Sequence, residues 1–160
     1  MAIELVRSYL KQFGRDGDII ELSASSATVA LAAEALGVIP ARIAKTLSFR
    51  ASDGGVWLIV AAGDAKIDNP KYKAQFGTKA SMLSPDEALT EIGHAVGGIC
   101  PFGIENPKVS VYLDVSLKRF ETVYPACGSS NSAIELNLED LYTYSKAAAW
   151  IDVCKGWEAE

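Results

Sequence analysis

The 160-residue sequence has few of the residues that build metal centres and disulfide frameworks. It contains three cysteines (Cys100, Cys127 and Cys154), 27 residues apart at each step and without a CxxC pair, and one histidine, His94. An odd number of cysteines at such spacings argues against a disulfide framework and against a zinc site. We therefore expect a protein that uses no metal and no other cofactor.

Long apolar runs are also missing. No stretch approaches the ~20 apolar residues that span a bilayer, and the amphipathic, charged residues 1–14 lack the apolar centre of a signal peptide. Hydrophobic residues make up 49% and charged residues 22% of the chain, a balance typical of a globular protein. We expect one domain over residues 1–160, a cytoplasmic location and no membrane partner.

The net charge of −5 disfavours DNA or another nucleic acid as a general partner. Residues 66–79 are a local exception, because four lysines there accompany a single acid, Asp68. Two interpretations stay open: an ordinary solvated helix, which charge alone favours, or a basic face that contacts a phosphate backbone. The four candidate backbone contacts are Lys66, Lys71, Lys73 and Lys79.

Hydrophobic spacing and turn residues predict helices and strands that do not alternate regularly. Ser84, Pro85 and Glu87 form a strong helix start with a capping box, and a turn at 52–55 joins two strands into a hairpin. The predicted helices cover 2–13, 28–37 (capped by Ser25 or Ser26), 70–76, 85–93 and 138–150. The predicted strands cover 18–22, 41–50, 56–62, 109–114, 121–124 and 132–137. This mixture is typical of the α+β class.

Lys45 occupies an unusual place in the predicted strand at 41–50. Side chains alternate across a strand, so Lys45 shares the apolar face of Ile43, Leu47 and Phe49. A buried, unpaired ammonium is costly. Either Lys45 reaches water along its own methylenes, or it lines a pocket that receives an anionic or carbonyl-bearing ligand.

The stretch at 93–103 holds four glycines and a proline in eleven residues. Such a loop suits a backbone that approaches another group closely, and its amides could bind an anion or oxyanion. It matches neither a dinucleotide fingerprint nor a Walker phosphate loop. The pattern alone leaves a purely structural turn equally open.

Four short motifs occur together in one order: KTL at 45–47, GGICPFG at 97–103, VYLD at 111–114 and GSSNSAIEL at 128–136. This set resembles the YbaK/aminoacyl-tRNA synthetase-associated domain family, in particular its free-standing prolyl-tRNA-editing (ProX-like) deacylases, over residues 28–141. The resemblance implies a mixed β-barrel-like sheet flanked by helices. It also implies hydrolysis of mischarged aminoacyl-tRNA in trans, with an aminoacyl-tRNA synthetase as a further partner.

The resemblance also implies the site residues. The lysine of the family maps to Lys45, and the GxxxP loop maps to Gly97, Gly98, Ile99, Cys100 and Pro101. We expect substrate contacts from Thr46, His94, Phe102, Gly103, Gly128, Ser129 and Ser130. An ester is already activated, so the protein needs chiefly to position it and to stabilise the oxyanion with loop amides. Cysteinyl-tRNA-specific relatives carry other residues where Ala126 and Ala133 align, so that specificity does not transfer.

Two other functions remain open. A non-catalytic module could recognise a tRNA end or a synthetase without hydrolysing anything. A thiol hydrolase could use Cys100 with His94, which requires that the two side chains lie adjacent and that the thiol pKa is low.

Overall fold

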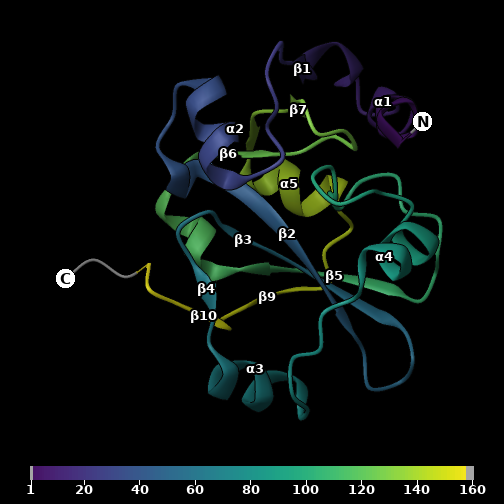
Figure 1. Ribbon diagram of the computed structural model, residues 1–160, viewed down its shortest axis with the longest axis vertical. Helices are drawn as coiled ribbons and strands as arrows, with labels where there is room; N and C mark the ends of the chain where they lie inside the picture. Colours follow the sequence, from purple (N-terminus) through teal and green to yellow (C-terminus); the bar gives the residue numbers. More distant parts are fainter. Residues whose placement is uncertain (1, 158–160) are drawn as a thin grey trace.

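The structure is a computed structural model that describes residues 2–157 (Figure 1). Its helices and strands follow one another without a regular alternation, as the α+β prediction requires. The helices are α1 (Ala2–Lys11), α2 (Val29–Leu36), α3 (Asn69–Phe76), α4 (Pro85–Ile92) and α5 (Leu138–Tyr144). The strands are β1 (Ile20–Glu21), β2 (Ile43–Arg50), β3 (Val56–Ala62), β4 (Lys66–Ile67), β5 (Val109–Asp114), β6 (Thr122–Pro125), β7 (Ser132–Ala133), β8 (Leu136–Asn137), β9 (Ala149–Ile151) and β10 (Cys154–Lys155).

A mixed sheet of six strands forms the centre, in the order β8-β6-β2-β3-β5-β9. β2 and β3 pair antiparallel as the expected hairpin, whereas β6 pairs with β2, and β5 with β3, in parallel. Two small pairs, β1 with β7 and β4 with β10, extend the fold beyond this sheet. The sheet curls into a half-barrel with helices around it, which confirms the predicted fold class (Figure 1).

Local signals in the sequence set most helix ends. Ser84 and Glu87 form the expected capping box of α4, and α2 ends at Gly37 with a left-handed backbone at φ 70°. The predicted cap of α2 was wrong, because Thr28 rather than Ser25 or Ser26 accepts the hydrogen bond from the amide of Leu31. A threonine in an extended conformation directly before the first helical residue satisfies that amide best.

One predicted element ends earlier than expected, and another is divided in two. The helix predicted over 138–150 stops at Tyr144, because Lys146 adopts a left-handed backbone (φ 54°) and residues 149–151 join the sheet as β9. The strand predicted over 132–137 divides into β7 and β8, which pair with different partners. In both segments, tertiary pairing overrides the local pattern.

β2 is covered on both of its faces. Phe49 is buried, as the alternation predicts, but Ala44 and Ser48 on the other face are buried as well. β2 lies at the centre of the sheet, and the segment at 81–83 adds backbone contacts to its end: the amide of Leu83 donates to the carbonyl of Ser48 at 3.1 Å. Alternation in the sequence therefore identified one buried face and missed the other.

Aromatic side chains fill the core on the side of α3. Phe76 stacks on Trp57 with ring centroids 4.2 Å apart, and the buried ring of Tyr72 contacts both Phe76 and Phe49. α3 lies at the end of the molecule opposite to α2 (Figure 1). Within residues 2–157, no helix is long and apolar enough to cross a membrane.

Candidate active site

A pocket of about 290 Å³ lies where four separate segments of the chain meet. One wall comes from residues 26–32 at the start of α2, a second from residues 43–48 of β2, a third from residues 82–88 around the start of α4, and a fourth from the loop at 96–99. Small side chains, including Ala126 and Ala133, close the remaining side. The structure thus brings together the lysine strand and the glycine loop that the sequence singled out separately.

Lys45 is half-buried at the edge of this pocket. Its ammonium donates to the backbone carbonyl of Ala65 and lies 3.5 Å from that of Gly63, beyond the end of β3. Burial lowers the pKa of Lys45, while the nearby groups of Cys154 and Asp64 act in the opposite direction. Of the two possibilities raised by the sequence, the structure shows a lysine that lines the pocket and is held by two carbonyls.

Thr46 presents an unsatisfied hydroxyl to the same pocket. Its Oγ1 atom is buried and has no hydrogen-bond partner among residues 2–157. Buried hydroxyls are usually paired, so this unpaired oxygen is an unusual feature of the pocket wall.

The glycine loop makes a close contact with protein backbone. A Cβ atom at Gly98 would lie 2.7 Å from the amide nitrogen of Ser129, and one at Gly97 would lie 3.2 Å from the Cβ of Ala27. Gly97 also has a left-handed backbone at φ 95°. The close approach expected from the glycines is therefore to the turn at 128–130 and to residue 27, which together hold the loop in place.

The loop amides differ in their availability. The amide of Gly98 donates to the carbonyl of Ala95 at 3.0 Å and closes a turn. Within residues 2–157, the amides of Gly97, Ile99 and Cys100 donate to no other group. Of the four amides expected to face an oxyanion, those of Gly97 and Ile99 are unpaired and belong to residues that line the pocket. The amide of Gly98 is occupied, and Cys100 is completely buried outside the pocket.

His94 and Cys100 lie adjacent beneath the loop, with 3.6 Å between the Sγ and Nε2 atoms. Both are fully buried, and burial raises the pKa of the Cys100 thiol to about 12. The His94 Nε2 atom lies 2.9 Å from the carbonyl of Phe102, and a carbonyl can only accept, so this nitrogen carries the proton. The pair has the proximity of a nucleophile and its base but neither the low thiol pKa nor a free basic nitrogen facing the sulfur.

Several expected substrate contacts lie outside the pocket. His94, Cys100 and Phe102 are completely buried. Pro101 and Gly103 border a second cavity of about 80 Å³, which Tyr9 and Lys146 also line. Gly128, Ser129 and Ser130 pack behind the glycine loop rather than beside the cavity.

The four lysines at 66–79 do not form one uniform face. Lys66, Lys73 and Lys79 are exposed, whereas Lys71 is half-buried and its ammonium lies 3.1 Å from the carboxylate of Asp152. Lys66 is close enough to Lys45 to lower its pKa further.

Sequence patterns did not identify the exposed side chains that line the pocket. Met82 and Val96 both line the pocket, yet they are 61% and 64% exposed. The helix start at Ser84 was readable, but its position beside β2 depends on contacts far along the chain. Within residues 2–157, no group of three or more His, Cys, Asp or Glu side chains is placed to hold a metal ion.

Comparison with known proteins places these observations in a family. The aminoacyl-tRNA editing domain matches residues 23–144. The chain is 57% identical over 158 residues to "Uncharacterized protein YwhH" of Bacillus subtilis, with 99% of this chain and 100% of that protein covered. It is also 33% identical over 94 residues to a proline--tRNA ligase of Thermotoga sp., which covers 58% of this chain and 16% of the ligase.

A solved structure gives the same picture. It is described as a candidate trans-editing enzyme for prolyl tRNA synthetase, and it superposes with a TM-score of 0.86 at 27% sequence identity. The match covers 97% of this chain and 98% of the other. The glycine loop at 96–99, the lysine strand and the other residues that line the pocket all lie within residues 23–144, which the editing-domain model matches. This chain therefore belongs to the aminoacyl-tRNA editing domain family.

Proposed function

We propose that this protein is a trans-editing deacylase, which hydrolyses the ester that joins a wrong amino acid to a tRNA. The observation that carries the proposal is the pocket itself. It joins Lys45 and Thr46 on β2 to the free amides of Gly97 and Ile99, inside a domain of the editing family. Its volume of about 290 Å³ lies near the lower end of the ~300–1,000 Å³ typical of small-molecule sites.

In the proposed reaction, water adds to the ester carbonyl carbon and negative charge collects on the carbonyl oxygen. The amides of Gly97 and Ile99 are available to stabilise that oxygen. The ester bond then breaks, and the ribose oxygen leaves with a proton, which the neighbouring ribose hydroxyl can relay. No protein nucleophile takes part.

Lys45 acts in this scheme as a substrate anchor. An ammonium has three N–H donors, and the carbonyls of Ala65 and Gly63 take up two of them. The third is assigned to the aminoacyl group or to the terminal phosphate. The exposed lysines Lys66, Lys73 and Lys79, together with Lys71, would contact the tRNA backbone, and this contact would weaken as salt is raised.

The test is deacylation of a panel of mischarged tRNAs by the unchanged protein and by Lys45→Ala. We expect hydrolysis of at least one substrate and a loss of about 100-fold in kcat/KM for the variant, the scale of a lost positioning contact. Lys11→Ala, a change at the surface end of α1, is the matched control and should leave the rate unchanged.

The main competing function is a module that binds tRNA or a synthetase without hydrolysis. Measurable tRNA binding together with no hydrolysis of any member of the panel would establish that module and end the deacylase proposal.

A further inference from the structure

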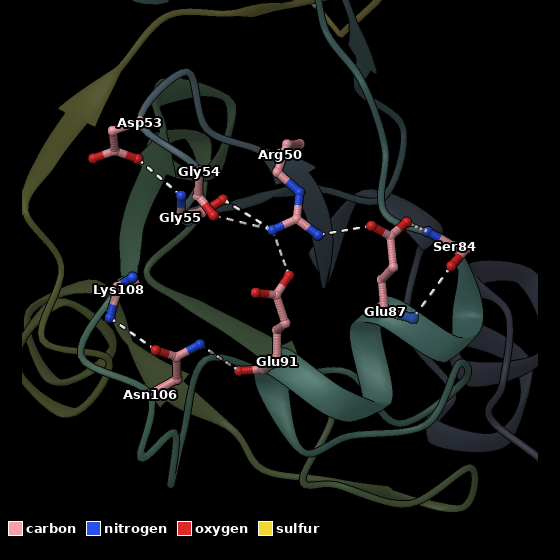
Figure 2. Close-up of polar contacts among 9 residues, drawn as sticks. All are labelled: Arg50, Asp53, Gly54, Gly55, Ser84, Glu87, Glu91, Asn106 and Lys108. Carbon is pink, nitrogen blue, oxygen red and sulfur yellow. Dashed lines mark hydrogen bonds and ion pairs between the residues drawn. The ribbon is translucent and has the colours of Figure 1, made fainter.

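Arg50, the last residue of β2, holds α4 by its guanidinium group (Figure 2). Its Nη2 atom donates to Glu87 at 2.7 Å, and its Nη1 atom lies 2.5 Å from the carboxylate of Glu91. The same Nη1 atom reaches the carbonyls of Gly54 and Gly55 in the β2–β3 turn, at 3.2 and 3.4 Å. One side chain therefore connects the hairpin turn to two successive turns of α4.

The acceptors of Arg50 are themselves fixed. One oxygen of Glu87 accepts from the amide of Ser84 at 2.9 Å in the capping box, while the other faces Arg50. At the end of α4, the carbonyl of Glu91 accepts from the side chain of Asn106 at 3.2 Å (Figure 2). Arg50 thus contacts groups whose positions are set at both ends of the helix.

The helix held in this way is also a wall of the pocket. Pro85 and Ala88 of α4, with Met82 and Leu83 just before it, line the cavity. Backbone contacts bring the same segment to β2, because the amide of Arg50 donates to the carbonyl of Ser81 at 2.8 Å. The distance between this wall and the rest of the pocket therefore depends on the contacts of Arg50.

We propose that Arg50 is a positioning residue that sets the width of the pocket and so its selectivity for the size of the aminoacyl group. This inference rests on the proposed function, since it assigns the aminoacyl group to the pocket. A single exposed ion pair contributes little to stability. A planar guanidinium with fixed acceptors in both the β2–β3 turn and α4, however, restricts the position of one relative to the other. Without it, α4 can move outward and admit bulkier groups.

The experiment compares the unchanged protein with Arg50→Met on one tRNA charged in turn with alanine, valine and leucine. The readout is the ratio of kcat/KM values between the smallest and the bulkiest group, which does not depend on the fraction of active protein. We expect this ratio to change about 10-fold toward the bulkier group, at the low end of what one methylene is worth in an apolar pocket. Arg50→Lys should recover part of the original ratio.

Arg7→Met is the matched control. Arg7 forms a comparable ion pair with Glu21 at 2.5 Å, with 34% of its side chain exposed against 32% for Arg50, and it does not line the pocket. Its ratio should equal that of the unchanged protein. Should Arg50→Met fail to fold, Glu91→Gln removes one of the two ion pairs and should shift the ratio in the same direction.

A second measurement separates this inference from the proposed function. Binding of non-hydrolysable 3′-alanylamino- and 3′-leucylamino-adenosine reports size selectivity without chemistry. If the unchanged protein hydrolyses nothing but binds these analogues selectively, the deacylase proposal fails while the role of Arg50 is still tested. A folded Arg50→Met protein with an unchanged ratio, or an unchanged protein that binds neither analogue, overturns the inference.

Discussion

Two walls of the pocket are held in place by different kinds of contact. The glycine loop at 97–99 is fixed by backbone packed against backbone, with Gly98 against the turn at 128–130. The wall formed by α4 is joined to β2 by backbone hydrogen bonds at residues 81–83, before the helix begins. α4 itself is held by charged side chains, with Arg50 between Glu87 and Glu91 (Figure 2). The first arrangement tolerates almost no displacement, since packed interiors have no room for an added atom. The second can change by small rotations of long side chains.

Under the proposed function, this difference would suit the two walls to separate tasks. Oxyanion stabilisation needs donors fixed to within a fraction of an ångström, which suits the loop. Discrimination among aminoacyl groups needs a surface whose position can be adjusted by single substitutions, which suits α4. Breaking each wall in turn should therefore give different defects.

Gly98→Ala should have the largest effect. The added Cβ would lie 2.7 Å from the amide nitrogen of Ser129 and 2.9 Å from its Cα atom, so the loop must shift. We expect deacylation to fall by about 100-fold and the free energy of unfolding to fall by about 1–3 kcal/mol, as in other overpacked sites. Initial rates and thermal unfolding measure the two effects.

Gly17→Ala is the control for Gly98→Ala, because a Cβ at Gly17 has no atom within 4 Å and its backbone is not left-handed. Full activity of Gly98→Ala would show that the loop moves freely and would remove the contrast between the walls.

Acidification should weaken the loop wall before the α4 wall. Burial lowers the pKa of His94 below its ordinary value of 6.5, partly opposed by the hydrogen bond to Phe102. The unfolded chain therefore takes up a proton below about pH 6.5 that the folded chain does not, and stability falls as pH falls through this range. The pKa of Glu87 is lowered by the amide of Ser84 and by Arg50. Glu87 therefore keeps its contribution to the free energy of unfolding until the pH falls below about 4.5, the ordinary glutamate value.

The measurement is Tm between pH 7.5 and 5.0 for the unchanged protein and for His94→Gln. His94 is the only histidine of the chain, so the fall in Tm should be largely absent from the variant. Equal slopes for the two proteins would contradict a buried neutral imidazole beneath the loop.

Cys100→Ser should have the smallest effect. The thiol is buried with a pKa raised to about 12, so it is not a thiolate at neutral pH, and we expect deacylation to stay within about threefold of the original rate. Complete loss of activity in a folded Cys100→Ser protein would instead support the thiol hydrolase hypothesis, in which the Cys100 side chain rather than the loop amides carries out catalysis.

The sequence predicted features that depend on near neighbours. The capping box at Ser84, the left-handed end of α2 at Gly37 and the β2–β3 hairpin all follow from a few adjacent residues. The helix over 138–150 was predicted too long because local propensity alone was considered. Its alanines favour a helix, but residues 149–151 pair with β5 and join the sheet.

Features of the site that depend on distant residues could not be predicted. Periodicity indicated that Lys45 was unusual, but not that the carbonyls of Gly63 and Ala65 would hold its ammonium. The glycines indicated a close approach, but not that Ser129 was the partner. The family resemblance named both segments, and only the folded chain shows that α4 lines the pocket and that Arg50 contacts this helix.

The turn at 128–130 touches both the glycine loop and the first helix. A Cβ at Gly128 would lie 2.9 Å from the backbone of Ala2 and 3.0 Å from Val6, while Gly98 packs against the same turn. During synthesis, α1 and the loop are made before the turn that joins them. Contacts between segments so far apart in sequence form slowly. A nascent chain halted before residue 128 would therefore carry the lysine and the glycines of the site without the turn against which the loop packs.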